Sequence, residues 1–188
     1  ELVVLLSQEN YELKSLDLYE SDGGMVAPKV PDDADALLIA SPQAPLSDVE
    51  DAAVMDFVAR GGSVMVLLDP QASLPGLLKR LDIGLHAGVV MDEKLVFPYN
   101  DRPVARYRAH PITTSLEEGR LLTVLAHIAP LRPPGDPPPW LKWNSLLETG
   151  RSGWVERGGD TVGGVAQYDP AVDAMGPSQN RLSPPVMA

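Results

Sequence analysis

Two pairs of polar side chains are the residues best placed for chemistry, because each pair follows a short apolar run. The runs are residues 36–40 and 64–68, and the side chains that follow them are Ser41, Gln43, Asp69 and Gln71. In open α/β sheets, ligands bind beyond the carboxyl ends of the parallel strands. If the runs are neighbouring strands, the four side chains form a rim that could bind a polar ligand, a sugar hydroxyl or a cation. Alternatively, Asp69 caps the next turn and Pro70 redirects the chain.

A hydrolase is a second use of the same rim, through a triad of Ser41, His110 and Asp69. A serine nucleophile of that kind lies on a tight elbow between strand and helix, typically within G-x-S-x-G. Ser41 lacks that motif, and the prolines after it delay the next helix. Because His110 precedes Pro111, its simplest role is at a helix start or in packing. We therefore expect no catalytic residue in this chain.

Metal, cofactor and nucleic-acid sites have no support in the sequence. The chain has no cysteine, and no two of its three histidines stand at the spacing of metal ligands. It also lacks the G-x-G-x-x-G and G-x-x-x-x-G-K-[ST] motifs of dinucleotide and P-loop sites. A net charge of −11 argues against nucleic acid, whose phosphates require concentrated Lys and Arg. We therefore expect no metal, no cofactor and no nucleic-acid partner.

Tryptophans offer a further ligand surface. Trp140, Trp143 and Trp154 could form an aromatic platform for a sugar, or they could cover the core beneath a proline-rich loop. We also hypothesise that residues 154–156 lie near the rim. The complete set of candidate ligand-binding residues is therefore Ser41, Gln43, Asp69, Gln71, His110, Trp154 and Glu156.

The elements that must position the rim form one strand–helix–strand unit. The continuous apolar runs 36–40 and 64–68 suit strands buried on both faces of a parallel sheet. Between them, Ser47 and Glu50 have the spacing of a capping box. The helix that follows ends where Gly61 can take the left-handed conformation. The crossover of such a unit is right-handed.

Weaker patterns place the remaining elements. We expect helices over residues 1–10 and 73–81 and a short helical turn opened by Pro111. Strands are expected at 13–18, 104–108, 121–127 and 140–147, with two more within 83–96. The proline-dense residues 131–139 predict a polyproline-like connection, with docking to an SH3-type groove as the alternative. From Gly150 onward, glycine and proline predict little regular structure, with one α/β domain over 1–170 and an irregular tail over 171–188.

No part of the chain has the composition of a membrane span. The longest apolar runs fall well short of the roughly 20 residues that cross a bilayer. Because the chain begins at Glu1, we expect it to be a segment of a longer protein, with a first strand of the fold before that residue.

Several stretches taken together resemble the extracytoplasmic domain of the auxiliary component of gliding-motility-type ABC transporters. The similar stretches are YELKSLDL, VPDDADALLIASPQAPLSDVEDAAVMDFVARGGSVMVLLDP, AHPITTSL, LLETGRSGWVE and YDPAVDAMGP. The longest of them carries most of the resemblance. The chain departs from the family pattern at Gly150, where the family has a serine, and over residues 178–188, where two adjacent prolines interrupt an expected strand.

The resemblance implies a flavodoxin-like, three-layer α/β domain with a mostly parallel sheet. This fold is related to the glutamine-amidotransferase-like fold but lacks its nucleophile. The resemblance also implies a periplasmic or cell-surface location, membrane anchoring by helices outside this sequence, and an ABC permease and ATPase as partners. It carries over no catalytic residues.

We therefore predict a non-enzymatic auxiliary domain of an ABC transport system, which recognises a sugar or small polar ligand or docks to the permease. One alternative is a small-molecule hydrolase or carbohydrate-active enzyme that uses the rim. Another is a purely structural interaction domain, similar to the related domain of intraflagellar transport proteins. An enzyme requires a base within reach of a nucleophile or metal, whereas a docking domain requires an exposed apolar patch.

Overall fold

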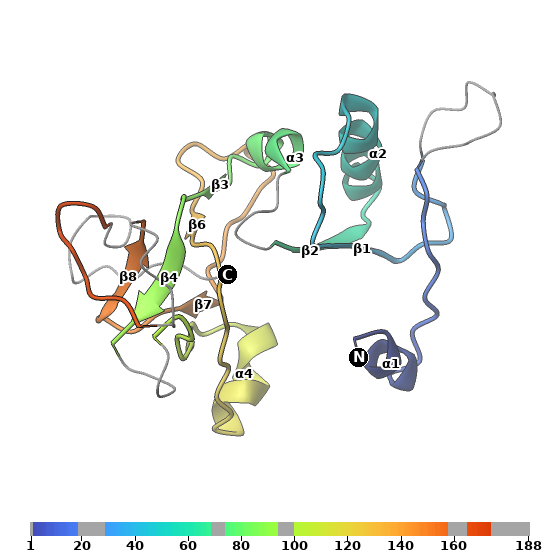
Figure 1. Cartoon of the computed structure of the whole chain (residues 1–188). Helices are drawn as coiled ribbons and strands as arrows, with labels where there is room; N and C mark the ends of the chain where they lie inside the picture. Colours follow the sequence, from blue (N-terminus) through green and yellow to red (C-terminus); the bar gives the residue numbers. More distant parts are fainter. Residues whose placement is uncertain (1, 19–28, 69–73, 94–99, 158–164, 174–188) are drawn as a thin grey trace. The chain divides into compact units, whose positions relative to one another are not determined.

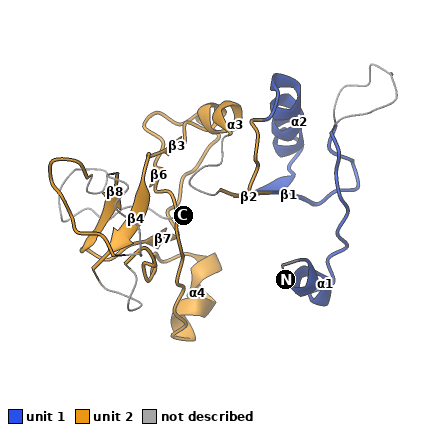
Figure 2. Ribbon diagram, in the orientation of Figure 1, with its two compact units in different colours: residues 1–39, 46–65 blue, residues 40–45, 66–188 orange. Residues whose placement is uncertain are grey.

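A computed structural model describes residues 2–18, 29–68, 74–93, 100–157 and 165–173 of the chain (Figure 1). These residues divide into two compact units (Figure 2). The first unit comprises residues 1–39 and 46–65, and the second comprises residues 40–45 and 66–188. The single domain over 1–170 stays a prediction, and most of the predicted tail lies outside the described residues.

Four helices and eight short strands form the described part of the chain. The helices are α1 (Leu2–Gln8), α2 (Asp48–Ala59), α3 (Pro75–Arg80) and α4 (Pro111–Glu118). The strands are β1 (Ala36–Ala40), β2 (Ser63–Leu67), β3 (Gly84–Leu85), β4 (Val89–Asp92), β5 (Arg106–Tyr107), β6 (Leu131–Arg132), β7 (Leu147–Glu148) and β8 (Gly153–Glu156).

The strands pair into four two-stranded sheets, β1–β2, β3–β6, β4–β8 and β5–β7. The last three are antiparallel. Only β1 and β2 run parallel, because hydrogen bonds join their starts (Ser63 N to Asp35 O, 3.4 Å) and their ends (Ser41 N to Leu67 O, 2.8 Å). The prediction of a mostly parallel sheet is therefore wrong for the described residues, and a flavodoxin-like three-layer fold is not confirmed.

The predicted strand–helix–strand unit is confirmed as β1–α2–β2. The Ser47 amide donates to the Glu50 carboxylate at 2.7 Å, and the Glu50 amide donates to the Ser47 hydroxyl at 3.4 Å. This capping box satisfies amides at the start of α2 that have no partner within the helix. Beyond the end of α2, Gly61 has φ +92°, the left-handed conformation that favours glycine.

The two faces of the β1–β2 sheet differ in exposure, which corrects the prediction of strands buried on both faces. Alternate residues are exposed along both strands, including Leu38, Met65 and Leu67. On α2, the buried apolar residues are Ala53, Val54 and Phe57. A continuous apolar sequence run therefore does not imply that both faces of a strand are covered.

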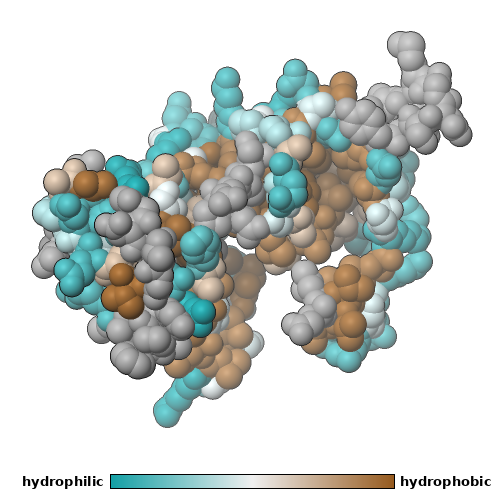
Figure 3. Space-filling model, viewed as in Figure 1, coloured by the Kyte–Doolittle hydropathy of each residue, from teal (hydrophilic) through white to brown (hydrophobic). Residues whose placement is uncertain are grey.

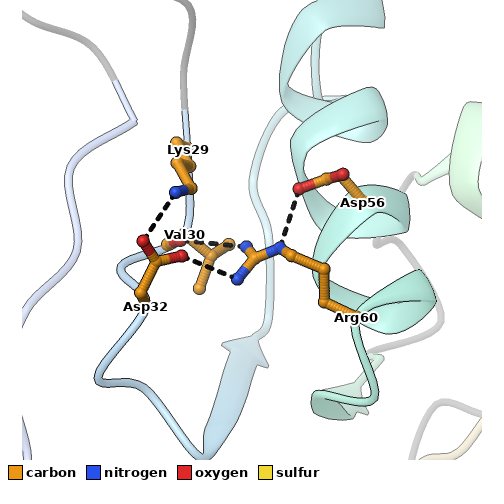
Figure 4. A network of polar contacts seen from close by, with 5 residues as sticks. All are labelled: Lys29, Val30, Asp32, Asp56 and Arg60. Atoms are coloured by element: carbon orange, nitrogen blue, oxygen red, sulfur yellow. Dashed lines mark hydrogen bonds and ion pairs between the residues drawn. The ribbon is translucent and has the colours of Figure 1, made fainter.

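A polar network joins the C-terminal end of α2 to the segment that precedes β1 (Figure 4). Arg60 donates to Asp56 at 2.9 Å, to Asp32 at 3.0 Å and to the Val30 carbonyl at 3.1 Å. Lys29 adds an ion pair with Asp32 at 2.8 Å. Because Val30 is buried, this network holds an apolar anchor of the first unit in place.

The core of the second unit lies on both sides of the β4–β8 pair. On one side, Val90 and Ala105 are packed by Leu125, Ile128 and Leu147. On the other side, a second cluster comprises Met91, Trp154, Ala166, Val89 and Tyr168. Side chains that alternate along a strand point to opposite faces, so this short pair separates two apolar clusters.

Several sequence-based expectations outside the central unit are confirmed. Helices form over parts of residues 1–10 and 73–81, and α4 begins at Pro111 as expected. Pro75 and Pro111 both stand in a first turn, where the missing amide hydrogen costs nothing. Strands within 83–96 and 104–108 also form, although each is shorter than the predicted range.

Other expectations are wrong. Residues 13–18 form no strand, and residues 121–127 contribute only a single bridge from Val124 to Val104. Of residues 140–147, only the last belongs to a strand. The expectation of little regular structure after Gly150 misses β8, whose four residues are all buried. Gly150 and Gly153 lie in the turn that leads into β8, where a Cβ atom would lie 3.0 Å from Oδ2 of Asp92 and 2.3 Å from Oγ1 of Thr149, respectively.

Candidate functional site

The first two rim residues lie together at the end of β1. The Gln43 side-chain amide donates to the Ser41 carbonyl at 2.9 Å and to the Ser41 hydroxyl at 3.4 Å. Ser41 has φ +47°, a left-handed conformation that is uncommon for a residue with a side chain. Gln43 is exposed in this turn, directly after β1, and the strand-end rim stays a prediction.

The other rim residues are placed less completely. Asp69 and Gln71 lie outside the described residues. His110 is the N-cap of α4, where its Nδ1 atom accepts the Ile112 amide at 3.3 Å. The helix-start role considered for His110 is thus the one that the structure shows.

Trp154 and Glu156 lie on the same face of β8 and contact each other. The indole nitrogen of Trp154 donates to Oε2 of Glu156 at 3.4 Å. Trp154 is only 2% exposed, and its ring meets Tyr168 edge-on with centroids 6.2 Å apart. Of the two uses considered for this tryptophan, packing into the core is therefore the one observed, whereas Trp140 is exposed.

A buried carboxylate that sequence reasoning missed organises the turn before β8. Asp92, at the end of β4, is 1% exposed and accepts hydrogen bonds from the Gly150 amide at 3.0 Å and the Ser152 hydroxyl at 2.5 Å. A buried charge requires such partners, since its desolvation is otherwise costly. Asp92 thus connects β4 to a turn about 60 residues further along the chain.

The same turn requires glycine at its end. A Cβ atom on Gly153 would lie 2.3 Å from Oγ1 of Thr149, a residue that is itself fully buried. The signal for this site in the sequence was the stretch LLETGRSGWVE, in which polar and small residues precede a β-forming Trp-Val pair. Nothing in that stretch identified its partner, because Asp92 is remote in sequence.

Another buried polar contact, between two residues that belong to neither strand, supports the β4–β8 pair. Asn100 donates to the Ala166 carbonyl at 2.6 Å and accepts the Ala166 amide at 3.0 Å. This reciprocal pair mimics a step of a β-ladder. It brings Ala166 against Trp154 and so completes the apolar cluster there.

Two surface carboxylates have lowered pKa values. Backbone hydrogen bonds from Asp136 (2.8 Å) and Gly135 (2.7 Å) lower the pKa of Asp82. The hydrogen bond from Lys29 lowers the pKa of Asp32. Asp82 thereby fastens the proline-dense segment to the chain after α3.

The described residues contain no group of three His, Cys, Asp or Glu side chains that could hold a metal ion. Within the same ranges, no helix has the length and apolar character needed to cross a membrane. Asp92 and its partners Gly150 and Ser152, which we call the Asp92 cluster, connect β4 to the turn before β8. At the rim, Ser41 is partly buried and Gln43 is exposed.

The exposed face of the β1–β2 sheet is apolar. We define it by Leu38 and Met65, which belong to the first unit and are 37% and 57% exposed. Figure 3 shows apolar surface in this region and over α1, where Val3, Val4 and Leu5 are also exposed. Apolar side chains gathered on one face are typical of surfaces that contact other proteins.

The chain matches a known protein family. A family model described as an ABC-type uncharacterized transport system matches residues 3–174. This range includes the apolar face, the rim and the Asp92 cluster. The comparison with curated proteins gives no match.

Proposed function

The chain belongs to this family of auxiliary components of ABC-type transport systems, and we propose that within such a system it is a non-enzymatic docking domain. The proposed contact is between the β1–β2 apolar face and the permease subunit. The observation that carries the proposal is the exposure of Met65 and Leu38 on neighbouring strands whose residues are apolar apart from Ser63. Burying such a face against a partner protein is favourable by about 25 cal/mol for each Å² of apolar surface.

A co-purification experiment tests the docking role. The full-length protein is co-expressed with the permease and ATPase of its own transport system, and the complex is captured through a tag on the permease. We expect Met65→Glu and Leu38→Glu to reduce capture about tenfold or more, because each places a charge in a desolvated contact. The matched control is Leu122→Glu, since Leu122 is 77% exposed in the second unit.

The possible outcomes separate cleanly. Loss of capture with the two face variants but not with the control supports docking through this face. Equal capture for all three variants overturns the choice of face. Failure of the wild-type protein to co-purify overturns the docking role itself.

The gliding-motility type and the extracytoplasmic location are part of the proposal and rest on the resemblance of the sequence stretches. A fusion of the full-length protein to a reporter that is active only outside the cytoplasm tests the location. Reporter activity is the expected result, and its absence in a stably expressed fusion would contradict the proposed placement.

Recognition of a small polar ligand at the rim is the second candidate function. The left-handed conformation of Ser41 favours it, because backbone strain in residues other than glycine is concentrated at functional sites. Thermal melting against sugars, nucleotides, peptides and divalent ions tests this function. A ligand at about 100 times its dissociation constant should stabilise the fold by about 2.7 kcal/mol. That stabilisation should be lost in Gln43→Ala, and a flat panel would leave docking as the role.

A further inference from the structure

A short ladder brings His86 and Arg132 to the same side of the β3–β6 pair. Gly84 pairs with Arg132 in the antiparallel register, and the His86 amide donates to the Pro130 carbonyl at 3.0 Å, which extends the ladder. Residues two apart along a strand share a face, so His86 follows Gly84 on the face that Arg132 occupies. The Arg132 side chain crosses over Gly84, because a Cβ atom there would lie 2.6 Å from Nε.

Arg157 approaches the same place from β8. Val89 pairs with Glu156, so Arg157 follows the strand beside Gly88, two residues from His86. Burial, then the positive charge of Arg157, then that of Arg132 lower the pKa of His86. Two guanidinium groups and one neutral imidazole therefore gather in a chain whose net charge is −11.

The carboxylates around this group are engaged elsewhere. Asp82 accepts two backbone amides, and Arg132 lowers its pKa without forming an ion pair with it. Asp173 accepts the backbone amides of Arg157 (3.1 Å) and Asp169 (2.8 Å). Among the residues that the structure describes, neither Arg132 nor Arg157 has an ion-pair partner.

We propose that His86, Arg132 and Arg157 form a binding site for an oxyanion of the phosphate class. Each guanidinium can donate two parallel hydrogen bonds to such an anion, and the imidazole is the third side chain that can donate. A doubly charged anion would offset the charges of the two arginines, neither of which forms an ion pair with a carboxylate among the described residues. The site does not depend on the proposed docking role, because it lies entirely within the second unit.

Proton NMR of the His86 imidazole tests the site directly. The full chain is titrated with inorganic phosphate at constant ionic strength, with acetate as the singly charged comparison. We expect saturable shifts of the His86 signal with phosphate and a higher His86 pKa in the complex, since a bound anion favours the imidazolium. Acetate should bind at least about tenfold more weakly, because it carries one charge.

Three variants and one control distinguish specific phosphate binding at this site from a general effect of positive charge. Arg132→Gln and Arg157→Gln should each weaken phosphate binding about tenfold, as expected for the loss of a charged hydrogen-bond donor. Gly84→Ala should also weaken it, because the new Cβ displaces the Arg132 side chain while the backbone conformation remains ordinary. Arg120→Gln, at an exposed position after α4, should leave the affinity unchanged.

Circular dichroism confirms that each variant is folded before it is titrated. The proposal is overturned if phosphate gives no saturable shift, if acetate binds equally well, or if Arg120→Gln weakens binding as much as Arg132→Gln. A phosphate affinity that is unchanged in Gly84→Ala and Arg132→Gln would likewise overturn it.

Discussion

At the scale of single residues, Asp92 makes the most consequential contacts in the described structure. Its carboxylate is 1% exposed and holds the Gly150 amide and the Ser152 hydroxyl. When one partner of a buried hydrogen bond is removed, the other partner stays buried with neither a protein group nor water to bind. The resulting loss of stability exceeds the net contribution of the hydrogen bond. Asp92 therefore supports the β4–β8 ladder through the turn that precedes β8.

We predict that Asp92→Ala lowers the free energy of unfolding by about 2 kcal/mol or more, since it leaves the Gly150 amide buried and unpaired. Ser152→Ala should cost about 1 kcal/mol, because it removes one bond and keeps the carboxylate's other partner. Urea denaturation measures both values. Equal stability of Asp92→Ala and the exposed control Asp136→Ala would contradict the structural role.

His86 makes stability depend on pH in a defined direction. Its pKa is below the usual value of 6.5 in the folded state, because of burial and the charges of Arg157 and Arg132. Below pH 6.5 the unfolded chain therefore binds the proton first, so acidification favours unfolding until the pH passes the folded pKa. Above about pH 7.5 the imidazole is almost entirely neutral in both states and contributes no pH dependence.

We expect the melting temperature to fall as the pH is lowered from about 7.5 to about 5.5, with a shallower fall in His86→Gln. The lowered pKa values of Asp32 and Asp82 act at lower pH, since their stabilisation is lost only as those carboxylates become protonated. Melting curves at several pH values measure the difference. Parallel curves for the two proteins would show that His86 does not titrate as described.

At the scale of elements, two glycines with positive φ allow the cost of backbone strain to be measured separately from the cost of a steric clash. Gly61 (φ +92°) has open space where a Cβ atom would be, whereas a Cβ on Gly88 (φ +121°) would lie 2.3 Å from the carbonyl oxygen of Glu156. Gly61 ends α2, and Gly88 lies where β4 begins its pairing with β8. The same substitution therefore tests a helix end and a strand contact.

We predict that Gly61→Ala costs about 1 to 2 kcal/mol of stability, the strain of a left-handed residue with a side chain. Gly88→Ala should cost clearly more, because the backbone of β8 must also move. Chemical denaturation of both variants gives the comparison. A smaller loss for Gly88→Ala than for Gly61→Ala would show that the β4–β8 contact is looser than described.

At the scale of the whole molecule, charge is the dominant feature. The chain carries 26 acidic and 15 basic side chains, and the ion pairs of Lys14, Lys29 and Arg60 are largely exposed. Exposed pairs contribute little, whereas a net charge far from zero destabilises a compact state by self-repulsion. Screening by salt should therefore favour the folded state.

We predict that the melting temperature rises as NaCl is increased from about 0.01 M to about 0.15 M, where the screening length falls from about 30 Å to about 8 Å. Sodium chloride is the appropriate salt here, because phosphate would also occupy the proposed oxyanion site. A fall in melting temperature over this range would mean that the ion pairs outweigh the repulsion.

The sequence by itself determined the features that depend on neighbouring residues. The capping box of Ser47 and Glu50, the helix end at Gly61 and the helix starts at Pro75 and Pro111 were all predicted correctly. Each depends on groups only a few residues apart, whose geometry is set by the backbone and by hydrogen bonds within one turn. Two strands and the helix between them followed from the same local signals.

Only the tertiary structure decided which segments pair and which faces are buried. Asp92 meets Ser152 across 60 residues, and Arg132 meets Gly84 through a ladder of two pairs, so no periodic pattern marks either contact. The exposed face at Met65 was misjudged for the same reason, because an apolar run has the same appearance whether one face is covered or two. Strand pairing and burial are properties of distant partners, and a single strand of about five residues carries too little information to name them.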